Sequence, residues 1–128
     1  MKKILIEISA GELVDKMTIL EIKLEKIKNS ELRIEIQKEL DGLKKSSNNI
    51  EESQSINTYF NKLKNVNLKL WDAENEKRLC EKNSDFKENF IKLSRDIHFL
   101  NDERAKIKLQ INESLGSQIK EIKQYTKY

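Results

Sequence analysis

Three polar residues stand out in this chain because each falls on or beside an otherwise apolar helix face. Asn101, Arg104 and Lys108 follow one another at steps of three and four residues, a spacing that brings side chains to one side of a helix. An arginine and a lysine held together between helices could bind a carboxylate or a phosphate. The spacing therefore predicts either an anion site between helices or a structural ion pair at Arg104.

Arg104 interrupts a face whose other members are all apolar. The face advances in steps of four and three residues, typical of a helix packed against another helix; its members are Phe86, Phe90, Leu93, Ile97, Leu100, Arg104, Ile107 and Ile111. A charge at such a position is costly to bury unless it is paired. Asp15 and Glu12 are candidate partners from the first helical segment, and Lys16 could add a cation to an anion site. We favour the ion pair, which would fix the helix register.

A second polar stripe runs beside the same apolar face. Its four members are Arg95, His98, Asp102 and Lys106, at steps of three, four and four residues. A carboxylate that orients an imidazole serves general-base catalysis, so His98 and Asp102 are the catalytic candidates and Arg95 a further ligand-binding candidate. The alternative for the whole stripe is an ordinary solvated helix surface. One histidine and one cysteine predict no metal site, and no cofactor motif is present.

The composition indicates one helical domain, which we place at residues 1–128. No proline, three glycines and 37% charged residues suit long helices. The net charge of +3 comes from interspersed signs, which disfavours nucleic-acid binding. A single cysteine, Cys80, excludes an internal disulfide and favours a cytoplasmic location. No stretch approaches the ~20 apolar residues of a membrane span.

Local signals divide the chain into helices. Residues 1–9 form an extended arm in which alternating isoleucines predict a short strand. Residues 9–12, Ser-Ala-Gly-Glu, form a capping box that starts a helix near Ala10. We place a break near residue 29 or 30, where Ser30 could cap a second helix, although one kinked rod remains open.

The second half of the chain is predicted as two long helices and a tail. Residues 46–55 are the expected linker, followed by helices over about 56–80 and 86–115. Gly116 suits the left-handed position that ends a helix. In the tail, residues 117–128, the candidate docking side chains are Ile119, Ile122 and Tyr125. The expected fold is all-α, an antiparallel helical bundle or long helical hairpins with a short N-terminal strand.

Both ends of the chain resemble a known family. The matching stretches are ISAGELVDKMTILEIKLEKI at 8–27, FIKLSRDIHFLNDERAKIKLQIN at 90–112 and GSQIKEIKQYTKY at 116–128. They are similar to short proteins of bacteria and their viruses that form a DUF6165-like family of unknown function. The family's short motifs fall on Asn101-Asp102 and Gly116-Ser117. The resemblance implies a recurring domain and supplies no activity.

Two functions follow as expectations. The favoured one is a non-enzymatic interaction domain that docks on a protein partner, with a homodimer buried through part of the 10–27 or 56–80 helix. The alternative is a small helical enzyme or anion binder of chorismate-mutase-like architecture that uses Arg104 and neighbouring cations. A solvent-reachable pocket that gathers Arg104 with other cations favours the alternative. A packed arginine–carboxylate pair favours the interaction domain.

Overall fold

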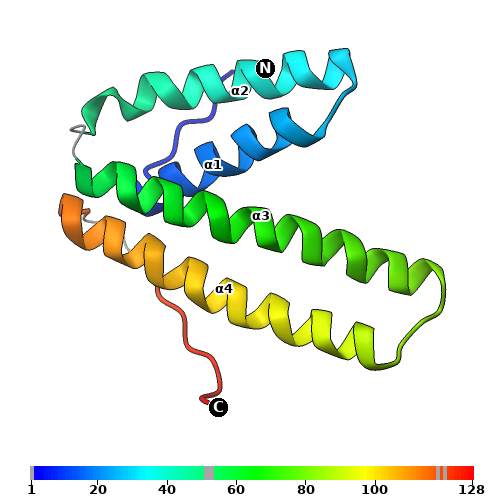
Figure 1. The fold of residues 1–128 in the computed structure, drawn as a ribbon. Helices are drawn as coiled ribbons and strands as arrows, with labels where there is room; N and C mark the ends of the chain where they lie inside the picture. The colour runs from blue at the N-terminus through cyan, green and yellow to red at the C-terminus, as the bar shows by residue number, and fades with distance from the viewer. Residues whose placement is uncertain (1, 51–53, 118, 120) are drawn as a thin grey trace.

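The described part of the chain folds into four α-helices arranged as two hairpins (Figure 1). The computed structural model describes residues 2–50, 54–117, 119 and 121–128. The elements are α1 (Ala10–Lys26), α2 (Ser30–Ser46), the short 3-10 turn η1 (Ser47–Asn49), α3 (Gln54–Lys82) and α4 (Glu88–Leu115). The prediction of an all-α fold is confirmed. None of the helices in the described ranges has the length and apolar character needed to cross a membrane.

Helix α1 lies at the centre of the arrangement because it packs against α2, α3 and α4. The long α3–α4 hairpin forms one layer, and its free end extends beyond α1 in Figure 1. Helix α2 covers the opposite side of α1 and contributes a single buried residue, Leu40. The order of layers is therefore α2, then α1, then the α3–α4 hairpin.

The core joins α1 to the near half of the α3–α4 hairpin. Its main cluster consists of Val14, Leu63, Val66, Leu70, Ile107 and Ile111. A smaller cluster, made by Ala73, Cys80 and Leu93, holds the two long helices together farther along. The predicted apolar face of α4 supplies Ile107 and Ile111 to the main cluster and Leu93 to the smaller one. Phe86 is an exception, because α4 begins only at Glu88 and the Phe86 side chain is 51% exposed.

Local signals set the ends of α1 and α2. Ser9 Oγ accepts a hydrogen bond from the Glu12 amide at 3.2 Å, which starts α1 at Ala10 as expected. Helices α1 and α2 are separate, and Asn29 rather than Ser30 caps α2 by accepting from the Leu32 amide. The Asn29 side chain satisfies an amide group in the first turn of α2 that has no partner within the helix. The predicted break is therefore right, but the predicted capping residue is wrong.

Three further expectations need correction. Residues 2–9 lie outside regular structure, so the arm is not a strand in the single chain. The described residues contain no second strand with which it could pair, and a strand is not stable alone. The expected linker is shorter, because α2 continues to Ser46 and α3 begins at Gln54; its residues 51–53 lie outside the described part. In the tail, Ile122 and Tyr125 are 90% and 66% exposed and are not buried against the helices, whereas Ile119 is partly covered, at 39% exposed.

Candidate functional site

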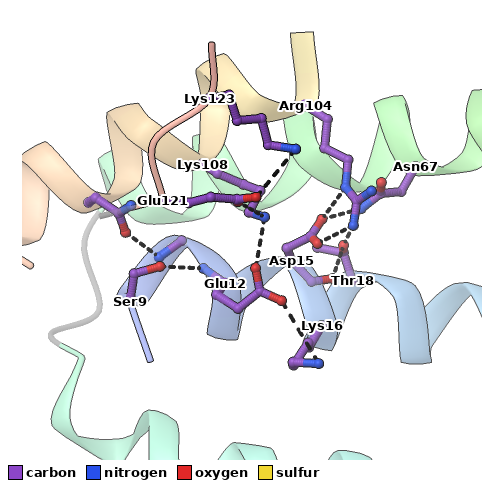
Figure 2. A network of polar contacts seen from close by, with 12 residues as sticks. Ser9, Glu12, Asp15, Lys16, Thr18, Asn67, Arg104, Lys108, Glu121 and Lys123 are labelled. Atoms are coloured by element: carbon purple, nitrogen blue, oxygen red, sulfur yellow. Dashed lines mark hydrogen bonds and ion pairs between the residues drawn. The ribbon is translucent and has the colours of Figure 1, made fainter. Parts of the chain in front are cut away.

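A network of polar side chains crosses the interface between α1, α3 and α4 (Figure 2). At its centre Asp15 of α1, with a side chain only 1% exposed, faces Arg104 of α4. Arg104 Nε donates to Asp15 Oδ1 at 2.9 Å, and Nη2 donates to Oδ2. This paired geometry is the strong form of an arginine–carboxylate contact.

Two short polar residues complete the surroundings of Asp15. Asn67 of α3 donates through Nδ2 to Asp15 Oδ1 at 2.9 Å and to Thr18 Oγ1 at 2.8 Å. The Thr18 hydroxyl in turn donates to the Asp15 carbonyl. Hydrogen bonding to Asp15 raises the pKa of Arg104, against the opposing effect of burial. The guanidinium charge is therefore compensated within the chain.

Lys108, one turn beyond Arg104, is compensated in the same way. Its side chain is 9% exposed, and Nζ donates to Glu12 Oε2 and to Glu121 Oε2, both at 2.8 Å. Burial alone would lower the pKa of Lys108, but the hydrogen bonds to these two carboxylates outweigh it and raise the pKa. The hydrogen bond from Lys108 likewise lowers the pKa of Glu121. Lys123 adds a second contact to Glu121 at 3.3 Å (Figure 2).

Residues at and just after the end of α4 accept hydrogen bonds from the first amide groups of α1. The Gly11 amide donates to Asn112 Oδ1 at 2.6 Å, and the Ala10 amide donates to Ser117 Oγ at 3.3 Å. A Cβ on Gly11 would lie 2.4 Å from the Lys108 carbonyl oxygen, so only glycine permits this approach. Because Ser9, Asn112 and Ser117 already accept from the first amide groups, this helix terminus is not an open anion site.

The two catalytic candidates lie in a groove between α4 and the tail. His98 and Asp102 line a hollow of about 590 Å³ together with Tyr125 and Tyr128. The Tyr128 hydroxyl donates to Asp102, and no hydrogen bond joins His98 to Asp102 among the described contacts. The imidazole instead contacts the rings of Phe99 and Tyr128, whose centroids lie 4.3 and 5.2 Å away. These contacts anchor the tail on α4, and no hydrogen bond to a carboxylate orients the His98 imidazole in the part of the chain that the structure describes.

The remaining candidates do not gather at one point. Arg95 is exposed and lies 5.9 Å from the centroid of the Phe99 ring, on the outer side of α4. Lys16 contacts only Glu12 among the described ion pairs, at 3.9 Å, with 49% of its side chain exposed. Asn101 lines a groove of about 310 Å³ beside Arg104 but makes no described bond in the network. Of the predicted residues, Arg104 bonds to Asp15 and Lys108 bonds to Glu12. Lys16 reaches this network only through its contact with Glu12.

The groove beside Arg104 differs from the expected anion pocket. Trp71, Glu74, Asn75 and Asn101 are among its lining residues, and Arg104 is the one cation on the described lining. That cation is already bonded to Asp15. The described residues also contain no group of three or more His, Cys, Asp or Glu side chains arranged to hold a metal ion.

Sequence reasoning missed the amide and hydroxyl members of the network. Thr18, Asn67 and Asn112 are all buried, with 0%, 5% and 2% of the residue exposed. The available signal is a short polar residue adjoining an apolar helix face, as Asn67 follows Val66 and Asn112 follows Ile111. Buried polar groups need partners, but the side chains of Asn67 and Asn112 find theirs on α1, which local spacing does not reveal.

The comparisons with known proteins give a family and no activity. No curated protein and no solved structure matched the chain. A family model described as a family of unknown function, DUF6165, matches residues 3–128. This match covers nearly the whole chain and includes every residue of the α1–α3–α4 network. The chain belongs to the DUF6165 family.

Proposed function

We propose that this protein is a non-enzymatic docking domain that binds a protein partner. The observation that carries the proposal is the neutralisation of Arg104 and Lys108 by Asp15, Glu12 and Glu121 within the chain. These cations are held by carboxylates where α1 packs on α4, and they are not left to bind a substrate. Function is then assigned to the outer surface. A cytoplasmic location, favoured by the unpaired buried Cys80, is part of the same proposal.

The free end of the α3–α4 hairpin is the docking surface that we propose. Leu79, Phe86 and Ile91 are there 56%, 51% and 55% exposed. The Phe86 ring is held edge-on against Phe90 at 5.4 Å between centroids. The Asp85 amide also donates to the Cys80 carbonyl at 2.8 Å, which orders the connection. A preorganised end with exposed aromatic and aliphatic side chains suits an apolar surface on a protein partner.

The alternative function is an anion-binding or enzymatic bundle that uses Arg104. The groove of about 310 Å³ beside Arg104 and Asn101 is the observation in its favour. Binding there would require a ligand to compete with Asp15 for the guanidinium, since both Asp15 oxygens accept from Arg104. The docking domain needs no such rearrangement, and we therefore prefer it.

The test uses the full chain as an immobilised bait, followed by titration with the purified partner that it captures. A Leu79→Ser/Ile91→Ser variant should raise the partner's Kd about tenfold or more, because each apolar side chain contributes about 1.5 kcal/mol or more when buried. The matched control is Leu32→Ser/Ile34→Ser on α2, where the side chains are similarly exposed, at 54% and 66%. The control should leave Kd unchanged.

Two results would contradict the docking proposal. One is a partner whose affinity is the same for the wild type and the hairpin-end variant. The other is saturable binding of a small dianion, measured by calorimetry with malonate and inorganic phosphate as probes, that Arg104→Met abolishes. The second result would instead support the alternative function.

A further inference from the structure

Residues 2–8 of the N-terminal arm expose apolar side chains that the single copy does not bury. Ile4, Leu5 and Ile6 are 79%, 88% and 77% exposed. Within the part of the chain that the structure describes, no hydrogen bond involves the backbone of residues 2–8. An extended segment with free amide and carbonyl groups is a template for pairing with another strand.

The arm has two different faces in an extended conformation. Side chains alternate, so Ile4, Ile6 and Ile8 share one face, and Lys3, Leu5 and Glu7 share the other. Ile8 is half-buried and lines a groove of about 550 Å³ with Leu13, Ile50 and Leu115. The isoleucine face is thus continuous, through Ile8, with a partly apolar hollow in the helical body. A paired arm could bury part of this hollow.

The arm is complementary to itself when two copies run antiparallel. The isoleucine faces of two arms meet only in registers that place even residues opposite even residues. Among these registers, one places Lys3 opposite Glu7 of the second copy, and it is centred on Leu5. The same register places Ile4 opposite Ile6 and repeats each contact through the two-fold axis. Opposite charges and apolar side chains in facing positions are the pairs that stabilise a sheet.

We propose that the arms of two copies pair as an antiparallel two-stranded ribbon centred on Leu5, and that this ribbon joins the protein into a homodimer. The contact is isologous, because each copy presents the same segment and the two-fold axis closes the assembly. The two ion pairs between Lys3 and Glu7 flank the central leucines. The inference is independent of docking at the end of the α3–α4 hairpin, because it concerns copies of this chain alone.

The first experiment tests the charge pairs by sedimentation velocity of the pure full chain over a wide range of concentration. Lys3→Glu and Glu7→Lys each place like charges face to face at both ends of the ribbon, and each should raise the dimer Kd about tenfold. The double variant Lys3→Glu/Glu7→Lys restores opposite charges and should return Kd to near the wild-type value. Lys2→Glu, which adds the same charge outside the pair, is the matched control.

The second experiment tests the register by cross-linking with oxidised glutathione. In the proposed ribbon Leu5 faces Leu5 of the second copy, so Leu5→Cys should form a disulfide-linked dimer. Ile6 faces Ile4, so Ile6→Cys should remain largely unlinked. The wild type is the background control, since its one thiol, Cys80, is buried. Circular dichroism melts of the arm variants below the dimer Kd should match the wild type, because the arm lies outside the core and dimerisation adds no stability there.

Three results would overturn the inference. A wild-type chain that stays monomeric at high concentration removes the dimer. A dimer whose Kd is the same in Lys3→Glu and Glu7→Lys as in the wild type is formed through another surface. Efficient cross-linking of Ile6→Cys without that of Leu5→Cys shows a register centred one residue later. None of these results bears on the heterologous partner, whose binding is measured separately.

Discussion

At the scale of single residues, Asp15 determines what the polar network does. Its carboxylate is buried at the centre of three helices and accepts from both Arg104 and Asn67. A buried pair of this kind adds little compared with a well-packed apolar pair, but removing one partner leaves an uncompensated charge. The network therefore specifies the register of α1 on α4. Arg104 is needed because the buried carboxylate of Asp15 requires an opposite charge.

Arg104→Met should lower the free energy of unfolding by about 3 kcal/mol. Methionine keeps much of the arginine stem, so the change isolates the loss of charge opposite buried Asp15. Urea denaturation at neutral pH measures the effect. The control is Lys106→Met on the exposed side of α4, which should change stability by less than about 0.5 kcal/mol.

A second substitution separates the pair from general packing. Asp15→Asn combined with Arg104→Met should recover part of the loss, because it removes the buried charge that the single change leaves behind. An Arg104→Met protein as stable as the wild type, or more stable, would contradict the structural role. It would also make Arg104 a ligand-binding candidate again.

At the scale of elements, the crossing of α1 over α4 depends on the backbone approach at Gly11. A Cβ there would lie 2.4 Å from the Lys108 carbonyl oxygen and 2.9 Å from Asn112 Oδ1. The first contact is with backbone, which cannot move aside as a flexible side chain can. Gly42 in α2 offers the opposite case, because a Cβ there would meet no described atom within 4 Å beyond its chain neighbours and the nearby backbone of its own helix.

Replacing each glycine with alanine should therefore have effects of opposite sign. Gly11→Ala should destabilise the protein by about 1–3 kcal/mol, since the clash outweighs the higher helix propensity of alanine. Gly42→Ala should stabilise it by up to about 1 kcal/mol, because only the helix propensity changes there. Thermal and urea unfolding of both variants check the pair. Two changes of the same sign would show that the close approach at Gly11 does not constrain the helix crossing.

At the scale of the whole molecule, the layers differ in how firmly they are held. Helix α2 contacts the body through α1 and buries one residue, Leu40. Helices α3 and α4 share the main cluster with α1, where Leu63 and Ile111 are fully buried. Local opening follows the number of buried apolar contacts, so the outer layer should open without the rest.

Hydrogen exchange measured by mass spectrometry should show this gradient. Amides of α2 are expected to exchange at least about tenfold faster than amides of α3 around Leu63, because α2 can detach from α1 while the main cluster stays packed. Mutation of Leu40 to alanine should increase the difference and leave exchange around Leu63 nearly unchanged. Equal protection of α2 and α3 would instead show that all four helices open as one unit.

The sequence predicts the elements better than their partners, for a physical reason. Ser9 starts α1 and Gly116, with a φ of 64°, ends α4 through contacts within a few residues, so local spacing reveals both. Arg104 is visible as a charge on an apolar face, and its need for a carboxylate follows. The choice of Asp15 over Glu12 depends on how α1 crosses α4, which no local pattern contains.

The polar members from other helices show the same limit. Asn67 is recognisable only as one more asparagine in a helix until α3 places it beside Asp15. The tail gives the clearest error, because its isoleucines suggest apolar docking. It is held instead by Glu121 on Lys108 and by Tyr128 on Asp102. Polar anchoring of this kind has no periodicity, so it could not be predicted from the sequence alone.

The hydrogen bonds between the start of α1 and the end of α4 have a consequence for biosynthesis. The Gly11 and Ala10 amides find their acceptors 101 and 107 residues later in the chain, and Asp15 finds its guanidinium 89 residues later. On the ribosome, α1 is made early and keeps these groups in contact with water until α4 emerges. The nascent chain therefore cannot complete its native bundle until Ser117 has left the exit tunnel.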